Sequence, residues 1–435
     1  MKKIEYAHVG ETLFLEQLPN GLRVLLWPKK DFYKTYALFT TNFGSIDNEF
    51  IPVGENEKVH FPDGIAHFLE HKLFEKEDGD VFQKFEKLGS FSNANTGFTR
   101  TSYLFSTTSK VEKNLEMLMD FVQEPYFTEE LIDKEQGIIA QEMQMYQDEP
   151  DWRLFLGLLE NLYPNNVLSC DIVGTRKSIS KITAEMLYQN FYRFYHPSNM
   201  TLVVGGRFDA DEIMRVIKEN QAKKKFSEIS LAQKTFSFKN DEPIIEIRSI
   251  KMNIVYPKFI LGLKGRDEIP KNGAELLQYR FSLKLYLQML FGPTSQNFLQ
   301  LYTKGLVDDS FSYAFTLDRG FHLIEINGDA DDPQKVTDFL QEKLKNYQQQ
   351  NDFNEETFEL LKRKMISKFI QSLNSIETVV NQLSCGSFSG EDTVFLETDL
   401  LLRDLSFAKF QKFVQQFMDN AVLSCFYIYP KESSE

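Results

Sequence analysis

The stretch His67-Phe68-Leu69-Glu70-His71 decides the fold and the chemistry that this 435-residue sequence predicts. An α-helix turns by about 100° per residue, so positions i, i+3 and i+4 share one face and these three side chains meet the same space. Two histidines in this spacing can bind one metal ion, with the carboxylate between them beside it. The alternative is two ordinary helix histidines and a solvated glutamate. The stretch predicts a metal-binding helix, which requires a third ligand from elsewhere.

The best candidate for that ligand lies between Phe127 and Tyr146. Thr128 is a good helix N-cap, and two glutamates follow it in the first turn. Helical spacing predicts an inward stripe that carries two carboxylates, with the members Leu131, Glu135, Ile138, Glu142 and Met145. A buried carboxylate normally finds a cation, a hydrogen-bond donor or a proton, and a Lys or Arg in the core would also serve. Together with the histidine helix, this pattern favours a metal site.

The longer string from Gly64 to Glu75, GIAHFLEHKLFE, resembles the pitrilysin, insulinase and mitochondrial processing peptidase family, the inverzincin zinc peptidases, and among them the short-form bacterial YmfH-like members. The resemblance implies that His67, His71 and Glu142 bind Zn²⁺. It makes Glu70 the general base and Glu135 a carboxylate that steadies the site. The separation of His71 and Glu142, 142 − 71 = 71 residues, is slightly short of the family spacing but compatible with it.

Further segments of the N-terminal half are similar to the same family. A turn at Leu18 leads into an alternating strand, and the segment from Tyr195 to Gly206 is similar to the approach to the last strand of the domain. Asn93 and Ala94 resemble the pair on an edge strand that aligns the substrate backbone by strand addition. A turn-forming role is the alternative for Asn93. His196 precedes a proline and has no helical partner, so we expect a structural role for it.

Length and composition agree with this interpretation. A chain of 435 residues suits two domains of about 200 residues each. The net charge of −14 argues against nucleic-acid binding through a basic surface. The three cysteines are scattered, and we expect neither a disulfide framework nor a cysteine metal site. No signal-peptide core or membrane span is expected, and from this we predict a cytoplasmic location.

Two pairs of segments indicate an internal duplication. Residues 127–131 resemble residues 353–357 at an offset of 226, and residues 82–89 resemble residues 298–305 at an offset of 216. Chance similarity between amphipathic helices is the alternative. The duplication predicts an α+β fold of two homologous domains, each a mixed, mostly antiparallel sheet packed with helices. We expect a catalytic domain at 1–228, a linker at about 229–242 and a domain without a metal site at 243–435.

The second half keeps none of the expected ligands. The offset of 226 places Leu361 and Lys368 at the positions of Glu135 and Glu142. An offset near 217 replaces the histidine motif with Lys284, Leu287 and Gln288. One metal site per chain is therefore expected.

The second half also departs from the family pattern. Many relatives carry an arginine and a tyrosine seven apart here, whereas this chain has Tyr302 and then Asp308 or Asp309. We therefore expect a heterodimer with a homologous chain that supplies the Arg/Tyr pair, and a homodimer is less favoured.

The predicted function is a zinc-dependent endopeptidase that cleaves peptides inside an enclosed chamber, as the metal-bearing subunit of such a pair. Two alternatives stay open. The chain could be a catalytically weak peptide-binding or assembly subunit, although such subunits usually lose part of the motif. The zinc could also be purely structural, although structural sites normally have four protein ligands and only three are found here.

Overall fold

The structure is a computed structural model that describes residues 1–226, 242–386, 390 and 392–431. The described residues form two compact units. Unit 1 takes its residues from Met1–Met143, Asp171–Thr235 and Ile370–Leu396. Unit 2 takes its residues from Gln144–Cys170, Phe236–Phe369 and Glu397–Glu435. The expected linker at 229–242 lies almost wholly outside the described residues, and the partition at 228 and 243 stays a prediction.

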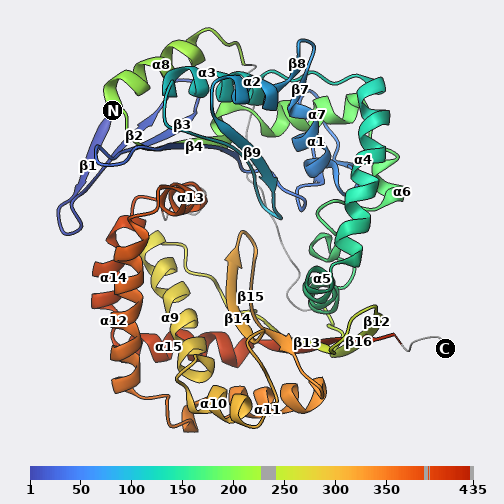
Figure 1. Ribbon diagram of the computed structural model, residues 1–435, viewed down its shortest axis with the longest axis vertical. Coiled ribbons are helices and arrows are strands. Elements are labelled where there is room, and N and C mark those ends of the chain that lie inside the picture. Colours follow the sequence, from blue (N-terminus) through green and yellow to red (C-terminus); the bar gives the residue numbers. More distant parts are fainter. Residues whose placement is uncertain (227–241, 387–389, 391, 432–435) are drawn as a thin grey trace. The chain divides into compact units, whose positions relative to one another are not determined.

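Unit 1 is built on a seven-stranded sheet in the order β1-β2-β3-β11-β4-β10-β9 (Figure 1). Its strands are, in that order, Lys2–Tyr6, Glu11–Gln17, Arg23–Pro28, Met200–Gly206, Thr35–Thr41, Thr101–Thr107 and Phe91–Thr96. Only β3 and β11 are paired in parallel. All residues of β4 and β11 are buried, because helices cover both faces of the sheet at its centre. The strand β9 lies at the edge.

The helices of unit 1 flank this sheet (Figure 1). They are α1 (Ile65–Leu73), α2 (Val81–Lys87), α3 (Val111–Gln123), α4 (Glu129–Asp148), α6 (Arg176–Ile179), α7 (Ala184–Phe194), α8 (Ala210–Ala222) and α13 (Ile376–Gly386). Helix α3 packs against β4 and β10, and α13 packs against β4 and β11 from the other face. Helix α1 contacts β9 and β10, so the histidine motif lies beside the edge strand.

Unit 2 has a five-stranded sheet in the order β12-β16-β13-β15-β14. Its strands are, in that order, Ile247–Met252, Val422–Pro430, Lys258–Lys264, Phe321–Asp329 and Ser312–Asp318. The helices are α5 (Pro150–Leu162), α9 (Gly273–Phe291), α10 (Gln296–Thr303), α11 (Pro333–Lys345), α12 (Glu355–Ser372), α14 (Thr398–Asp404) and α15 (Phe407–Asn420). The core joins apolar residues of the strands to α9, α11 and α15.

The predicted duplication is confirmed by the sheet topology. Five strands of unit 1, β3-β11-β4-β10-β9, have the same order as the five strands of unit 2. In each sheet the first pair is parallel and the other three pairs are antiparallel. The α+β class with two homologous domains, predicted from short sequence similarities, is therefore observed.

Each sheet also packs against a helix from the other half of the sequence. Helix α5 lies across β13 and β16 of unit 2, and α13 lies across β4 and β11 of unit 1. A glycine permits each close approach. A Cβ on Gly205 of β11 would lie 2.5 Å from a methyl group of Val380, and a Cβ on Gly262 of β13 would lie 2.6 Å from methyl groups of Leu158.

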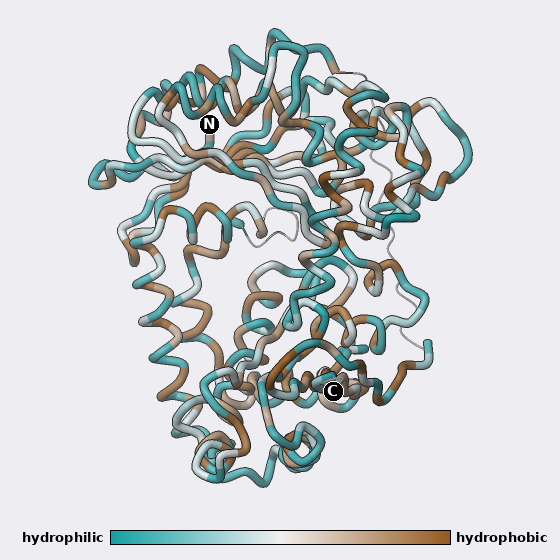
Figure 2. Tube along the Cα trace, turned by 45° about the vertical axis from the view of Figure 1, so that its right-hand side comes forward, coloured by the Kyte–Doolittle hydropathy of each residue, from teal (hydrophilic) through white to brown (hydrophobic). Residues whose placement is uncertain are grey.

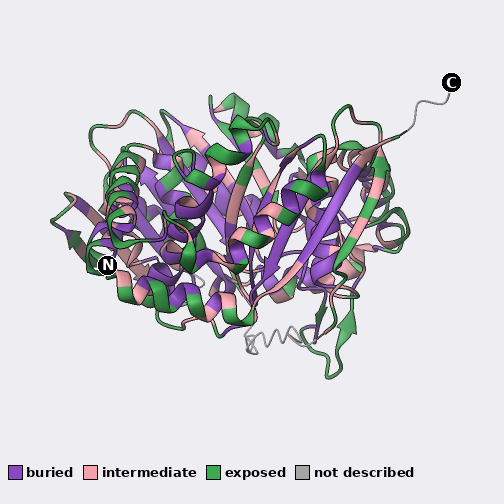
Figure 3. Ribbon diagram, turned by 90° about the horizontal axis from the view of Figure 1, so that it is seen from below, coloured by how far each residue is buried: buried purple, intermediate pink, exposed green. Residues whose placement is uncertain are grey.

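Burial follows the apolar pattern of the sequence. Apolar residues gather along the strands and the inner helix faces, while loops and outer helix faces are hydrophilic (Figure 2). The central strands of each sheet are correspondingly buried, and the outer helix faces are exposed (Figure 3). Within the described part of the chain, the helices are too short or too polar to cross a membrane.

Candidate active site

Helix α1 carries the motif, and almost every one of its residues is buried. A helix that is buried all round belongs to the interior of a protein, which explains why apolar residues surround the polar ones. The turn before it is held by Asp63, whose carbonyl accepts a bond from Ser178 Oγ at 2.7 Å and whose carboxylate accepts one from Asn48 at 2.7 Å. Gly64 has φ = +90°, and a Cβ there would lie 2.6 Å from the Val173 carbonyl oxygen. Only glycine therefore fits at this turn.

Helix α4 supplies the two carboxylates. It begins as predicted at Thr128, whose hydroxyl accepts a bond from the Leu131 amide at 3.3 Å. The predicted inward stripe is wrong in part, because Ile138 and Met145 are 46% and 69% exposed. The buried residues of the helix are instead Ile132, Glu135, Ile139 and Met143. The physical reason is that Glu135 lies on the buried face, whereas Glu142 lies at its edge, where its side chain is 24% exposed.

The structure brings His67, His71 and Glu142 together. Each offers one ligand atom, and these atoms lie within 4.8 Å of one another. The Nε2 atoms of His67 and His71 are each 3.6 Å from a carboxylate oxygen of Glu142. Ligand atoms around a tetrahedral zinc ion, with bonds of about 2.0–2.1 Å, are separated by roughly 3.3 Å. The two histidine–Glu142 separations are thus close to those of a tetrahedral zinc site, and imidazole and carboxylate are donors that Zn²⁺ takes.

Glu70 lies beside these ligands, and its side chain is buried. The hydroxyl of Thr96, at the end of β9, donates a hydrogen bond of 2.6 Å to Glu70 Oε2. Burial raises the pKa of the Glu70 carboxyl, although the nearby His67 and the Thr96 hydroxyl act in the opposite direction. A buried carboxyl with a raised pKa is suited to accept and return a proton near neutral pH. Thr96 lies two residues after Ala94 in the sequence, and no sequence pattern predicted this role for it.

Glu135 lies on the far side of His71. Its Oε1 accepts a hydrogen bond from His71 Nδ1 at 3.0 Å, and its Oε2 accepts one from Lys72 at 3.3 Å. Burial acts to raise the pKa of Glu135, but the bond from His71 and the charge of Lys72 lower it overall. A proton on Nδ1 leaves Nε2 of His71 free to bind a metal.

The pKa of His71 itself is raised. Burial acts to lower it, but the bond to Glu135 and the nearby carboxylates outweigh that effect. His67 differs, because its buried Nδ1 has no hydrogen-bond partner among the described residues.

Comparisons with known proteins agree with this geometry. Residues 50–176 match the family model described as insulinase (peptidase family M16), and residues 181–365 match the peptidase M16 inactive domain. YmfH of Bacillus subtilis (strain 168), described as an uncharacterized zinc protease, is 45% identical over 96% of this chain and 96% of its own length. The chain belongs to peptidase family M16.

Solved structures show the same M16 architecture. An M16-like peptidase from Alicyclobacillus acidocaldarius is 34% identical, with a TM-score of 0.90 over 97% of this chain and 99% of that chain. A protease from Helicobacter pylori shares the fold at 16% identity, with a TM-score of 0.77 over 96% of this chain and 99% of that chain. The resemblance stated from the sequence is thereby confirmed, as is its short bacterial type.

The expected substrate-binding residues of this M16 chain lie on the edge strand. Asn93 and Ala94 are in the middle of β9, which among the described strands pairs only with β10, so the turn interpretation of Asn93 is wrong. Asn93 is exposed, and its Oδ1 accepts a bond from the Ala94 amide at 2.9 Å. The strand ends at Thr96, and the hydrogen bond from its hydroxyl to Glu70 connects the edge strand to the expected general base.

The second half of this M16 chain places other residue types at the equivalent positions. Lys284, Leu287 and Gln288 lie on α9, and Leu361 and Lys368 lie on α12. Among the described residues, the cluster of His67, His71 and Glu142 is the one group that could hold a metal. Tyr302, at the position of the expected family arginine, is 46% exposed, and Asp308 accepts bonds from Ser310.

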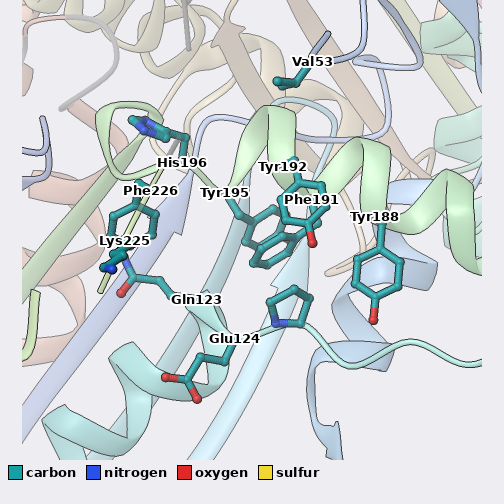
Figure 4. A pocket seen from close by; sticks show the side chains of 11 residues that line it. Val53, Gln123, Glu124, Tyr188, Phe191, Tyr192, Tyr195, His196, Lys225 and Phe226 are labelled. Carbon is teal, nitrogen blue, oxygen red and sulfur yellow. The ribbon is translucent and has the colours of Figure 1, made fainter. Parts of the chain in front are cut away.

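Unit 1 also contains an open cavity of about 1000 Å³ (Figure 4). It contains none of the expected zinc ligands and is largely aromatic, with lining residues that include Tyr188, Phe191, Tyr192, Tyr195 and Phe226. His196 lines it too, and its Nδ1 lies 2.7 Å from Ser198 Oγ. This contact fits the structural role expected for His196.

Proposed function

We propose that the chain is a zinc metalloendopeptidase that hydrolyses peptide bonds at the site formed by α1 and α4. The observation that carries the proposal is the convergence of His67, His71 and Glu142, with the buried Glu70 beside them. Three protein ligands are typical of catalytic zinc, which keeps one position open, whereas structural sites use four. When bound, Zn²⁺ supplies Lewis acidity that polarises the peptide carbonyl and acidifies water.

In this mechanism Glu70 is the general base. Thr96 holds its Oε2, so Oε1 is the oxygen that takes the proton of the attacking water. The raised pKa of Glu70 lets the same carboxyl hold this proton and return it to the leaving amine. Glu135 keeps the His71 ring oriented through Nδ1. The substrate backbone pairs with β9 near Asn93 and Ala94, as an added strand.

The test of this function is Glu70→Gln, which keeps the shape of the side chain and removes the base. We expect bound zinc at one ion per chain and a loss of peptide cleavage of about 10²–10⁴-fold. Metal analysis and a quenched peptide library measure the two quantities. Cleavage that persists in the variant, with contaminating proteases excluded, would rule out Glu70 as the base.

We further propose that the chain works as the metal-bearing subunit of a heterodimer that encloses its substrate. Tyr302, and then Asp308 or Asp309, stand where the resemblance places the arginine and tyrosine of many relatives, and none of them can replace a guanidinium donor. Purification from the native source tests this, with a homologous chain carrying the Arg/Tyr pair expected in the same fractions. Full activity of the isolated chain would contradict it. The cytoplasmic location stays a prediction for cell fractionation.

A second candidate is a peptide-binding or assembly subunit with weak catalysis. The same departure, at Tyr302 and at Asp308 or Asp309, favours it. Peptide binding without cleavage, both alone and with any co-purified chain, would support this candidate over the endopeptidase.

A further inference from the structure

Lys72 follows the second histidine of the motif and has no place in the chemistry described above. Its side chain is 0% exposed, although an ionised lysine in a protein interior is costly unless it is paired. Two carboxylates pair with it: Glu75 on one side, and Glu135 at 3.3 Å on the other. One residue beyond His71, Lys72 leaves the helix about 100° away from that histidine. It therefore reaches Glu135 from a different direction than the imidazole does.

Glu135 is consequently held by two donors, one on each oxygen. His71 Nδ1 lies 3.0 Å from Oε1, and Lys72 Nζ lies 3.3 Å from Oε2. A carboxylate held at both oxygens has little freedom to rotate, so the imidazole that it orients is also fixed. His67, whose Nδ1 has no partner among the described residues, lacks such a chain of contacts.

Charge gives a second argument for Lys72. The carboxylates of Glu70, Glu135 and Glu142 lie around a place that fits a divalent ion, and the buried ammonium group of Lys72 pairs with one of them, Glu135. Glu75 in turn lies 3.8 Å from Lys134, so the outer carboxylate has a second cation. Charges buried at close range need this compensation, because solvent screens them weakly.

We propose that Lys72 is a positioning residue of the metal site: through Glu135 it fixes the orientation of His71 and thereby strengthens metal binding. The inference rests on the proposed function, because it assigns to Lys72 a role toward the same zinc ion. Lys72 contacts neither the donor atoms of the ligands nor the reacting atoms. It acts on the metal site through its bond to Glu135, which in turn bonds His71.

The test measures zinc affinity directly, by competition with a chromophoric chelator, in the full-length protein. Lys72→Met keeps the length and apolar stem but removes the charge, and we expect zinc to bind about tenfold more weakly. Glu135→Gln should weaken binding about 10–100-fold. Because Lys72 acts through Glu135, the double variant should bind zinc within about threefold of Glu135→Gln alone.

Lys264→Met is the matched control. Lys264 is also buried, at 2% exposed, but it lies on β13 of unit 2, where its Nζ donates to the Leu162 carbonyl at 3.3 Å. Its substitution removes a buried lysine without touching the metal site, so zinc affinity should stay within about twofold of the wild type. Thermal melting of the metal-free variants separates loss of stability from loss of affinity. If Lys72→Met does not fold, Lys72→Gln carries the same expectation.

Zinc affinity of the Lys72 variant within twofold of the wild type would overturn the inference. The inference would also be overturned if the zinc affinity of the double variant fell by the product of the two single-variant effects. If the wild type cleaves peptides and binds one zinc ion while Lys72→Met binds it equally well, the proposed function stands and the inference alone fails. If the wild type binds no zinc through His67 and His71, both fail.

Discussion

The two halves of this chain have sheets of the same topology, but the helices beside these sheets carry different side chains. The five strands β3-β11-β4-β10-β9 and β12-β16-β13-β15-β14 have the same order and the same pattern of directions. In the first half, α1 and α4 carry two histidines and three carboxylates at one place. In the second, the corresponding positions on α9 and α12 hold Lys284, Leu287, Gln288, Leu361 and Lys368.

Buried carboxylates show what this difference means physically. Glu135 in the first half is 4% exposed, is bonded by His71 and Lys72, and has a lowered pKa. Glu325 in the second half is mostly buried too, but its Oε2 has no hydrogen-bond partner among the described residues. Burial raises the pKa of Glu325 to about 7. Burial alone therefore raises the pKa of an acid in this fold, whereas the two donors that Glu135 receives from α1 lower its pKa and fix its orientation.

The largest expected effect is a loss of zinc affinity, which compares equivalent positions in the two halves. Glu142→Ala removes a ligand and should weaken zinc binding by more than about 100-fold, beyond the range for a residue that only bonds to a ligand. Lys368→Ala, the corresponding change on α12, should leave zinc affinity unchanged. Chelator competition measures both. Equal zinc affinity in the two variants would contradict the assignment of the ligands to the first half.

The strand glycines provide the next comparison. Gly205→Ala and Gly262→Ala place a methyl group against Val380 and Leu158, respectively, and should each destabilise the protein by about 1–3 kcal/mol. Gly137→Ala is the control, because a Cβ there meets no atom within 4 Å, and in a helix interior alanine should stabilise by up to about 1 kcal/mol. Urea unfolding gives these values. Unchanged stability after substitution of Gly205 and Gly262 would argue against close packing of α13 and α5 on the sheets.

The contact between Thr96 and Glu70 is expected to have a smaller effect on catalysis. Thr96→Val removes the hydroxyl and keeps the shape, so kcat should fall about tenfold, the size of one hydrogen bond to a charged group. Zinc affinity should not change, and Thr96→Ser should restore most of the rate. Steady-state kinetics at saturating zinc measures this. A fall in zinc affinity with unchanged kcat would show that Thr96 acts on the metal rather than on the base.

The last expected effect is a change of stability with pH, and it concerns Glu325. Because its folded pKa lies above its unfolded value, Glu325 takes up a proton on folding, and stability falls as pH rises from about 4.5 to 7. The advantage of Glu325→Gln over the wild type in stability should therefore be larger at pH 8 than at pH 5, by about 2–3 kcal/mol. Urea unfolding at the two pH values measures the difference. A stability gain that is the same at both pH values would show that the raised pKa of Glu325 is not its cause.

Local spacing made much of the site predictable from the sequence. The positions of His67, Glu70 and His71 follow from one helical turn, and Thr128 marked the beginning of α4. The duplication was found from two short similarities. The rotation of α4 was predicted less well, because two carboxylates were taken as the centre of the buried stripe, whereas Glu142 lies at its edge and Ile138 and Met145 are exposed.

Features set by tertiary contacts could not be predicted in this way. Helices α5 and α13 each pack on the sheet of the other half, and this packing joins residues more than 100 positions apart in the sequence. The strand glycines at these contacts have no local sequence pattern that would predict it. Lys72 was visible in the motif, but its burial between Glu75 and Glu135 depends on α4. Thr96 likewise meets Glu70 only because β9 passes beside α1.

The central claim is that three side chains from α1 and α4 bind one divalent ion. Anomalous diffraction at the zinc absorption edge from crystals of the metal-loaded protein tests it most directly. We expect one peak per chain, about 2.0–2.2 Å from Nε2 of His67, Nε2 of His71 and a carboxylate oxygen of Glu142. A well-ordered structure with the ion elsewhere, or with Glu142 turned away from both imidazoles, would contradict the account.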